Sequence, residues 1–194
     1  MFEQLEKWDQ DLFLFLNGLH VDWLDWPMVL ISEPLAWIPV YLLFFYWVFK
    51  HQKTAKRIAI TVLGLALTIT IADMVSYRVF KKGVKRYRPS HNTIIGPKTH
   101  VLPGLDGEIY TGGKYGFVSG HSANYFGIAL FMFLATGRKR KRTWLFLWAA
   151  LIAYSRIYLG VHYPGDIVGG MLIGLGGASL SYFIADYFVR RFNL

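Results

Sequence analysis

RIAITVLGLALTITIADMVSYRVFKKGVKRYRPS, residues 57–90, joins a long apolar run to a dense cluster of cations. Residues 57–80 are long enough to cross a bilayer, because a spanning helix takes roughly 20 mostly apolar residues. The next ten residues carry five Lys or Arg side chains. The stretch therefore predicts a membrane-spanning helix that leads into a strongly cationic segment.

Apolar runs of similar length recur along the chain. Hydrophobic residues make up 54% of its 194 residues, which is high for a soluble protein. The predicted spans are 27–49, 57–80, 119–136, 143–160 and 166–189. We therefore expect an all-α integral membrane helical bundle, formed by a single domain over residues 1–194.

The first 20 residues have a different character. Apolar side chains recur there at helical spacing, and acidic residues lie mostly off that stripe. The segment lacks the basic start and small-residue cleavage site of a secretory signal. Residues 1–20 are thus predicted to be an interfacial helix of the mature protein that packs against the bundle, since they carry too many charges for a sixth span.

The formal net charge of +9 comes mainly from clusters that border the predicted spans. Membrane topology explains such clusters better than nucleic-acid binding, so no nucleic-acid partner is expected. By the positive-inside rule, the clusters at 50–57, 138–142 and 190–191 face the cytoplasm. The segment 81–118 and the turn 161–165 then lie together on the extracytoplasmic side. The chain has no cysteine, which rules out disulfides and thiolate metal sites.

The cations of residues 81–90 therefore lie against the positive-inside trend. An anionic ligand would explain their position. The alternative is that they extend toward the interface and contact lipid headgroups, as juxtamembrane Lys and Arg often do. Two further polar segments, predicted on the same side, favour the ligand.

The first of these segments is GGKYGFVSGHSAN, residues 112–124. Its early glycines indicate a flexible approach to the helix that begins near Ser119. A helix N-terminus presents unpaired N–H groups and suits a phosphate, and Gly120 would let a ligand oxygen come close to the backbone. His121 would face the same mouth. The simpler alternative is that Ser119 only caps the helix and His121 is an ordinary interfacial polar residue.

The second segment is YSRIYLGVHYPGD, residues 154–166. Arg156 offers a forked donor for phosphate oxygens. A tight turn can bring Asp166 back to the imidazole of His162, which would set the tautomer and leave the other ring nitrogen as a nucleophile. Asp166 could also merely cap the next helix. Together these groups suit phosphoryl transfer without a metal.

With these residues in these positions, the chain resembles the type 2 phosphatidic acid phosphatase (PAP2) family. The resemblance rests on three motifs in order: Lys81, six residues, Arg88-Pro89; Ser119-Gly120-His121; and Ser155-Arg156, five residues, His162, three residues, Asp166. The resemblance spans residues 81–166 and implies a PAP2/haloperoxidase-like core.

The resemblance implies a role for each matching residue. His162 would attack phosphorus to give a phosphohistidine, Asp166 would orient it, and His121 would protonate the leaving oxygen. The remaining matches would form the phosphate cradle: Lys81, Arg88, Ser119, Gly120 and Arg156. No metal or other cofactor is implied.

Two features depart from the family pattern. Val118 stands where the family's second motif usually begins with Pro, so the segment leading into the helix is expected to be less rigid. The membrane branch commonly has six spans, against the five predicted here, which leaves five or six open.

We therefore expect a lipid phosphatase in a bacterial cytoplasmic membrane, with its site on the extracytoplasmic side. Candidate substrates are undecaprenyl diphosphate, phosphatidylglycerol phosphate, phosphatidic acid and lipid A phosphates. The alternatives are a lipid phosphotransferase on the same fold and a non-enzymatic anionic-lipid binder or transporter. The sequence indicates neither the oligomeric state nor the role of the loop 90–114.

Overall fold

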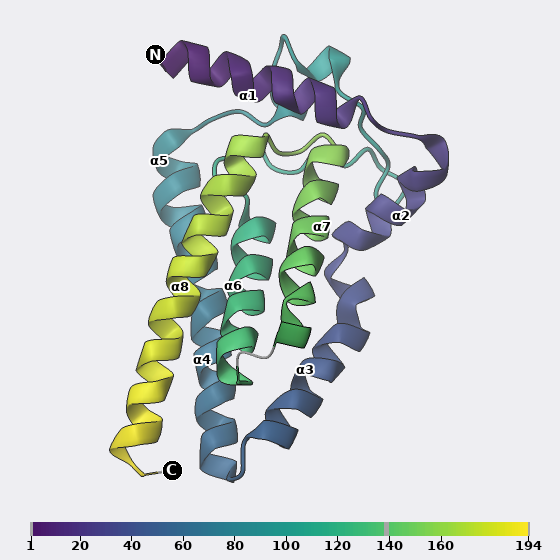
Figure 1. Cartoon of the computed structure of the whole chain (residues 1–194). Helices are drawn as coiled ribbons and strands as arrows, with labels where there is room; N and C mark the ends of the chain where they lie inside the picture. The colour runs from purple at the N-terminus through teal and green to yellow at the C-terminus, as the bar shows by residue number, and fades with distance from the viewer. Residues whose placement is uncertain (1, 138–139, 194) are drawn as a thin grey trace.

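The computed structural model describes residues 2–137 and 140–193, which form helices joined by short turns and by one long irregular segment (Figure 1). The predicted all-α class is confirmed. The α-helices are α1 Phe2–Asn17, α2 Asp22–Ser32, α3 Ile38–His51, α4 Ala55–Met74, α5 Lys82–Val84, α6 Gly120–Ala135, α7 Trp144–Tyr158 and α8 Pro164–Arg191.

Helix α6 lies at the centre of the bundle, in contact with α4, α7 and α8 (Figure 1). Glycines allow its close approach to α8. A Cβ on Gly170 or Gly174 would overlap the backbone carbonyl oxygen of Ser119 or Ala123. Such small-residue contacts are typical of helix pairs in membranes.

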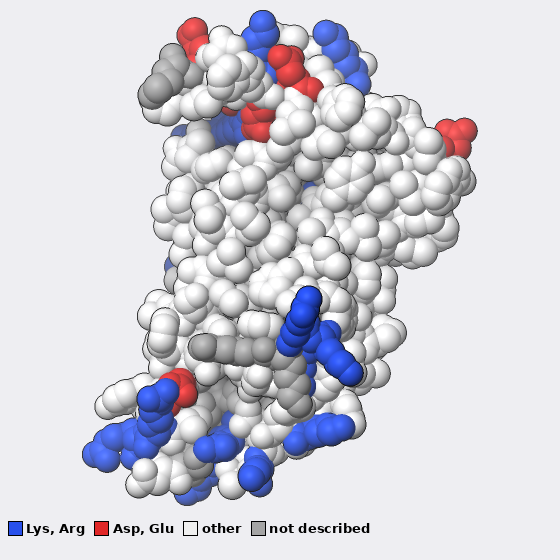
Figure 2. All heavy atoms as spheres, viewed as in Figure 1, with Lys and Arg blue, Asp and Glu red and all other residues white. Residues whose placement is uncertain are grey.

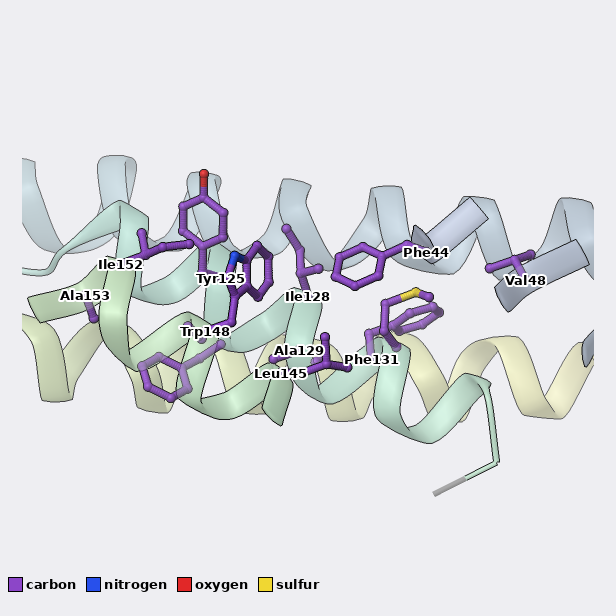
Figure 3. Close-up of a cluster of buried hydrophobic side chains, with 14 residues drawn as sticks. Phe44, Val48, Tyr125, Ile128, Ala129, Phe131, Leu145, Trp148, Ile152 and Ala153 are labelled. Carbon is purple, nitrogen blue, oxygen red and sulfur yellow. The ribbon is translucent and has the colours of Figure 1, made fainter. Parts of the chain in front are cut away.

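Large apolar side chains of α3, α6 and α7 pack together beside this contact (Figure 3). The Trp148 ring meets Tyr125 and Phe44 edge-to-face, with centroids 5.1 and 5.6 Å apart. In a bilayer, helices gain little from transferring apolar groups out of lipid, so dense packing of this kind is what holds them together.

The helix that begins with α4 continues to Val84 and is 30 residues long. The end predicted from the sequence is residue 80, with the loop starting at residue 81. Instead, a π-helical turn over Val75–Lys81 and then α5 carry the helix four residues further. It ends where Lys85 adopts a left-handed conformation, φ 52°. Lys81 therefore projects from a helix, and a π-helical turn is a feature often found at functional sites.

The first predicted span, 27–49, is not one straight helix. Helix α2 begins earlier, at Asp22, and stops at Ser32, and the helix from Pro34 to His51 is bent from it by 77°. Pro34 lacks an N–H and disfavours helical geometry at the residue before it. Glu33 accordingly has extended φ and ψ of −83° and 125°. The prediction of a continuous helix was wrong at this point.

Helix α1 lies across one end of the bundle, over the loops (Figure 1). The Phe13 side chain is fully buried, with its ring 5.3 Å from that of Tyr163. Asn17 is also buried, and its Nδ2 donates to the carbonyl oxygens of Ile157 and Tyr158. Helix α1 thus packs against the bundle, and the predicted position of residues 1–20 at a membrane interface stays a prediction.

Helix length supports only part of the predicted span count. In the described residues, Ala55–Val84 and Pro164–Arg191 are long and apolar enough to cross a membrane, and the bent pair Asp22–Ser32 and Pro34–His51 would form a third span if counted as one. Helices α6 and α7 have 16 and 15 residues. At 1.5 Å per residue they are about 24 and 22 Å long, short of a hydrocarbon core of about 30 Å. Five spans therefore remain a prediction.

On the face shown in Figure 2, charged side chains gather at the two ends of the molecule. A largely uncharged band separates the end that carries α1 from the opposite end, where Lys and Arg predominate. The turn between α3 and α4 and the C-terminal end of α8 lie at this basic end (Figure 1). Arg138 and Lys139 of the predicted cluster 138–142 lie outside the described residues. Which side of a membrane the basic end faces stays a prediction.

Candidate active site

The three sequence motifs meet at the end of the bundle that α1 covers. The charges of Lys81, Arg88 and Arg156 all act on the His162 ring. His121 in turn lies near enough to His162 to interact with its charge. The predicted residues come from several places in the fold. They are Lys81 from the π-helical turn, Arg88 from the irregular segment, Ser119, Gly120 and His121 from the start of α6, Arg156 from the end of α7, His162 from the turn after it, and Asp166 from the first turn of α8.

His162 and Asp166 form a buried pair. Nδ1 of His162 lies 3.2 Å from Oδ2 of Asp166, and the two residues are 1% and 0% exposed. The backbone N–H of Tyr163 donates to the same carboxylate oxygen at 3.1 Å. Asp166 thus both caps α8 and orients the imidazole. Because Nδ1 must carry the proton of a neutral ring to pair with a carboxylate, Nε2 is left unprotonated.

The His162 ring is held neutral by its surroundings. Burial comes first, and the charges of Arg88 and Arg156 add to it, so that the pKa of His162 lies well below its usual 6.5. A neutral imidazole with a free Nε2 is a competent nucleophile at neutral pH.

Arg86 was not predicted as a site residue from the sequence, yet it forms an ion pair with the other oxygen of Asp166. Its Nη1 lies 2.9 Å from Oδ1 of Asp166, and its Nη2 lies 2.7 Å from Asp9 and 3.0 Å from Glu6. Burial disfavours its charge, but the Asp166 and Asp9 carboxylates outweigh burial and raise the pKa of Arg86. No sequence pattern relates α1 to a cation some 80 residues later.

Two buried arginines keep donors that have no protein acceptor. Arg88 is 6% exposed and Arg156 is 2% exposed. Nη1 of Arg88 and Nε of Arg156 are buried without a hydrogen-bond partner among the described residues. Burial and the neighbouring Arg156 charge lower the pKa of Arg88. A bound anion would accept hydrogen bonds from the unpaired donors and would reduce the repulsion between the adjacent cations.

Arg156 is held in position by hydrogen-bond partners that were not predicted from the sequence. Its Nη1 donates to the hydroxyl of Ser32, just before the break after α2, and its Nη2 donates to the Tyr110 hydroxyl at 2.8 Å. The guanidinium also lies over the Tyr110 ring, 5.0 Å from its centroid. Through Tyr110, the loop 90–114 therefore contacts the site directly.

The start of α6 has the geometry of an anion site. Ser119 is its N-cap, with Oγ accepting from the N–H of Ser122 at 3.3 Å. Its backbone N–H donates to the carbonyl oxygen of Asp166 at 3.0 Å, which ties α6 to α8. A Cβ on Gly120 would meet no described heavy atom within 4 Å. Open space therefore lies beside Gly120, in the first turn of this helix, where unpaired N–H groups are available to an anion.

Two of the glycines before α6, Gly112 and Gly116, pack closely against site residues, whereas the flexible approach predicted for this segment stays a prediction. A Cβ on Gly116 would lie 2.8 Å from Oδ2 of Asp166 and 3.5 Å from Nδ1 of His162. A Cβ on Gly112 would overlap the Arg88 guanidinium. These glycines are needed because other site residues pack directly against the backbone. Val118, which replaces the usual Pro, is 1% exposed and faces Gly169 of α8.

The sequence profile of the PAP2 superfamily matches residues 59–190, which contain all three motifs. The chain belongs to this superfamily. It is a membrane lipid phosphatase, a hydrolase of the PAP2 type.

Similar proteins of known function include two lipid A 4'-phosphatases. The one from Bacteroides thetaiotaomicron is 37% identical, over 98% of this chain and 83% of its own length. The one from Porphyromonas gingivalis is also 37% identical, over 89% of this chain and 71% of its own length.

Solved structures show the same fold. Aquifex aeolicus LpxE superposes with a TM-score of 0.61 at 24% identity, covering 88% of this chain and 92% of its own. The PAP2-type phosphatidylglycerolphosphate phosphatase from Bacillus subtilis superposes with a TM-score of 0.65 at 20% identity, covering 97% of this chain and 87% of its own.

Proposed function

We propose that this phosphatase removes a phosphate monoester from a lipid A-type glycolipid, by way of a phosphohistidine on His162. The substrate class is suggested by the two lipid A 4'-phosphatases, each 37% identical to this chain. The observation that carries the chemistry is the buried His162–Asp166 pair, 3.2 Å apart, beside unpaired donors of Arg88 and Arg156.

In the first step, Nε2 of His162 attacks phosphorus while the bond from phosphorus to the lipid oxygen breaks. His121 gives its proton to that leaving oxygen, which departs as an alcohol. Charge spreads over the three remaining phosphoryl oxygens as they pass through the trigonal arrangement. Those oxygens are held by the phosphate cradle, which we assign to Lys81, Arg88, Ser119, the Gly120 N–H and Arg156.

In the second step, water attacks the phosphohistidine and breaks the bond between phosphorus and Nε2. His121, now neutral, takes the proton of that water, and inorganic phosphate leaves with both histidines restored. Asp166 holds the His162 ring in one orientation through both steps. The steps call for no metal or other cofactor.

An apolar groove supports an amphiphilic substrate. It has a volume of about 450 Å³ and lies between α3, α4 and α6. Its lining includes Pro34, His121 and Asn124 together with many apolar side chains. A lipid whose chain lies in this groove would bring its headgroup to the proposed acid. The side chains that line the groove are Pro34, Tyr41, Phe44, Phe45, Leu65, Ile69, His121, Asn124, Tyr125 and Ile128.

We further propose a single-domain, five-span protein of a bacterial cytoplasmic membrane. The basic end of the bundle would face the cytoplasm. The site would then open on the extracytoplasmic side, and α1 would lie along that interface. The two shorter helices, α6 and α7, would cross with the help of the longer helices packed around them and of local bilayer thinning.

The test is phosphate release from a panel of pure lipids in neutral detergent micelles. The panel comprises lipid A phosphate, undecaprenyl diphosphate, phosphatidylglycerol phosphate and phosphatidic acid, with p-nitrophenyl phosphate as the soluble control. We expect kcat/KM to be highest for lipid A, with inorganic phosphate as the product. A higher value for another lipid would reassign the substrate, and no preference over p-nitrophenyl phosphate would refute a lipid substrate.

A further inference from the structure

Three cations at the site end have no part in the chemistry described above. Of the five in KKGVKRYRPS, Lys81 and Arg88 belong to the cradle and Arg86 is paired with carboxylates. Lys82 and Lys85 remain, and Lys114 joins them from a later part of the same irregular segment. None of the ion pairs found among the described residues involves these three lysines.

These lysines line one pocket of about 650 Å³ that also reaches the cradle. No acidic residue is among the described residues that line it. Lys81 and Arg88 contribute to its wall, and both act electrostatically on His162. The pocket therefore adjoins the place of reaction. The side chains that line it are Tyr77, Lys81, Lys82, Lys85, Arg88, Gly113, Lys114 and Tyr115.

Backbone contacts fix the two sides of this pocket relative to each other. The N–H of Arg88 donates to the carbonyl oxygen of Lys114 at 3.2 Å, and the N–H of Gly116 donates to that of Arg86 at 2.9 Å. Tyr87 and Tyr115 form an isolated antiparallel bridge. Lys114 is thus held beside the segment that carries Lys85.

The lysines are also partly oriented. The Lys114 ammonium lies 5.4 Å from the Tyr87 ring centroid and 5.7 Å from that of Tyr115, and the Lys82 ammonium lies 5.3 Å from that of Tyr77. Lys85 has φ 52°, a left-handed conformation that residues other than glycine rarely adopt. A strained residue in a cationic pocket that adjoins a catalytic centre is a candidate for function.

We propose that Lys82, Lys85 and Lys114 form a second anion subsite, which binds a second phosphate of the same substrate molecule while the first phosphate lies in the cradle. The proposal rests on the phosphatase function proposed above. One phosphate already has Lys81, Arg88 and Arg156 as partners. Three more cations without a carboxylate repel one another, and a second dianion would relieve that repulsion.

The test compares two substrates that differ by one phosphate. Lipid A phosphorylated at both ends and lipid A with only the 4'-phosphate are assayed in neutral detergent micelles. The variant is the triple substitution Lys82→Gln, Lys85→Gln and Lys114→Gln. Its matched control, Lys50→Gln, Lys53→Gln and Lys56→Gln, removes the same charge near the turn between α3 and α4, at the opposite end of the bundle.

We expect the parent protein and the control to have a lower KM for the bisphosphorylated lipid. In the subsite variant this preference should fall by about tenfold in the ratio of the two KM values, because three modest charge contacts to the second phosphate are lost together. The expected change in kcat is small, since the reacting phosphate keeps its cradle.

An equal rise of KM for both substrates would overturn the proposal, since it would indicate general attraction of anions. A second result would also overturn it. If added phosphatidylglycerol stimulates hydrolysis of the monophosphorylated lipid by the parent but not by the variant, the three lysines bind the headgroup of a neighbouring lipid. If the parent hydrolyses neither lipid, the proposed function fails separately. Equilibrium binding then tests the subsite separately. The proposal holds if the parent binds the bisphosphorylated lipid more tightly than the 4'-monophosphorylated lipid and the variant does not, and it fails if both proteins bind the two lipids with the same ratio of affinities.

Discussion

The reactivity of the site depends on one buried pair of residues. Asp166 receives the Tyr163 N–H, His162 Nδ1 and the Arg86 guanidinium at 3.1, 3.2 and 2.9 Å. With three donors around it, the carboxylate has one stable orientation. The imidazole that contacts it is therefore held in one orientation as well. The position of Nε2 follows from these contacts.

Asp166→Asn should therefore lower kcat by about 10³-fold with little change in KM, because the amide can no longer enforce the tautomer that leaves Nε2 free. Steady-state kinetics on the best lipid substrate measures both constants. Asp11→Asn, on the exposed part of α1, is the matched control and should change kcat less than twofold. A similar loss of kcat in both variants would contradict a specific role of Asp166 in orienting the imidazole.

Gly116→Ala should disturb the same pair from the side. The new Cβ would come 2.8 Å from the Asp166 carboxylate, closer than real Cβ contacts allow, so the carboxylate must move. We expect at least a tenfold loss of kcat/KM. Gly176→Ala places its Cβ where no heavy atom lies within 4 Å and should leave kcat/KM as it is. If Gly116→Ala is as active as Gly176→Ala, the packing around Asp166 tolerates more movement than these distances indicate.

The pH dependence follows from the environment of His162. Burial and the nearby arginines lower the pKa of His162 well below 6.5, so the nucleophile stays neutral as the pH falls through 6.5. The acid limb of the kcat/KM profile, which reports protonation of His162, should therefore lie below pH 6.5. In Arg88→Gln the acid limb should move to higher pH, because a cation that disfavours the protonated ring is gone. An acid limb at or above pH 6.5 in the parent protein would contradict this reading.

Helix α1 connects the N-terminus to the catalytic centre. Its acidic side chains Glu6 and Asp9 hold Arg86, which in turn holds Asp166. Asp9 also accepts the backbone N–H of Gly165 at 2.8 Å, at the start of α8. Displacing α1 should therefore affect both the fold and the catalytic carboxylate.

Phe13 is the apolar anchor of this helix. Phe13→Ala should reduce the free energy of unfolding by about 3 kcal/mol, because it opens a cavity against Tyr163. Phe15→Ala, which changes a side chain of a residue that is 63% exposed, should stay within about 0.5 kcal/mol. Thermal unfolding in detergent, read by tryptophan fluorescence, compares the two. Equal losses of stability would show that α1 is not anchored through Phe13.

Helix limits were largely predictable because they follow from apolar runs and caps. The predicted spans 119–136 and 143–160 correspond to α6 and α7 within two residues at each end. The break at Glu33 had a signal in Pro34 that the long apolar run outweighed. The π-helical turn Val75–Lys81 had no such signal, because its residues also fit an ordinary α-helix.

At the scale of the whole molecule, the motif spacing predicted which residues would meet, and the structure brings all eight together at one end of the bundle. The spacing could not predict their supports. Arg156 is held by Ser32 and Tyr110, and Arg86 by Glu6 and Asp9. These contacts join segments that are 46 to 124 residues apart, and a single sequence carries no local pattern for such pairs.

Hydrolysis through His162 is tested most directly by phosphate release from lipid A phosphate in detergent with EDTA, comparing the parent protein with His162→Ala. We predict that release by the parent persists in EDTA and that the variant loses at least about 10³-fold in kcat. A rapid quench of the parent with labelled lipid should also trap an acid-labile, alkali-stable phosphoprotein that the variant lacks. Equal release by both proteins, or loss of the parent's activity in EDTA, would contradict a metal-free His162 nucleophile.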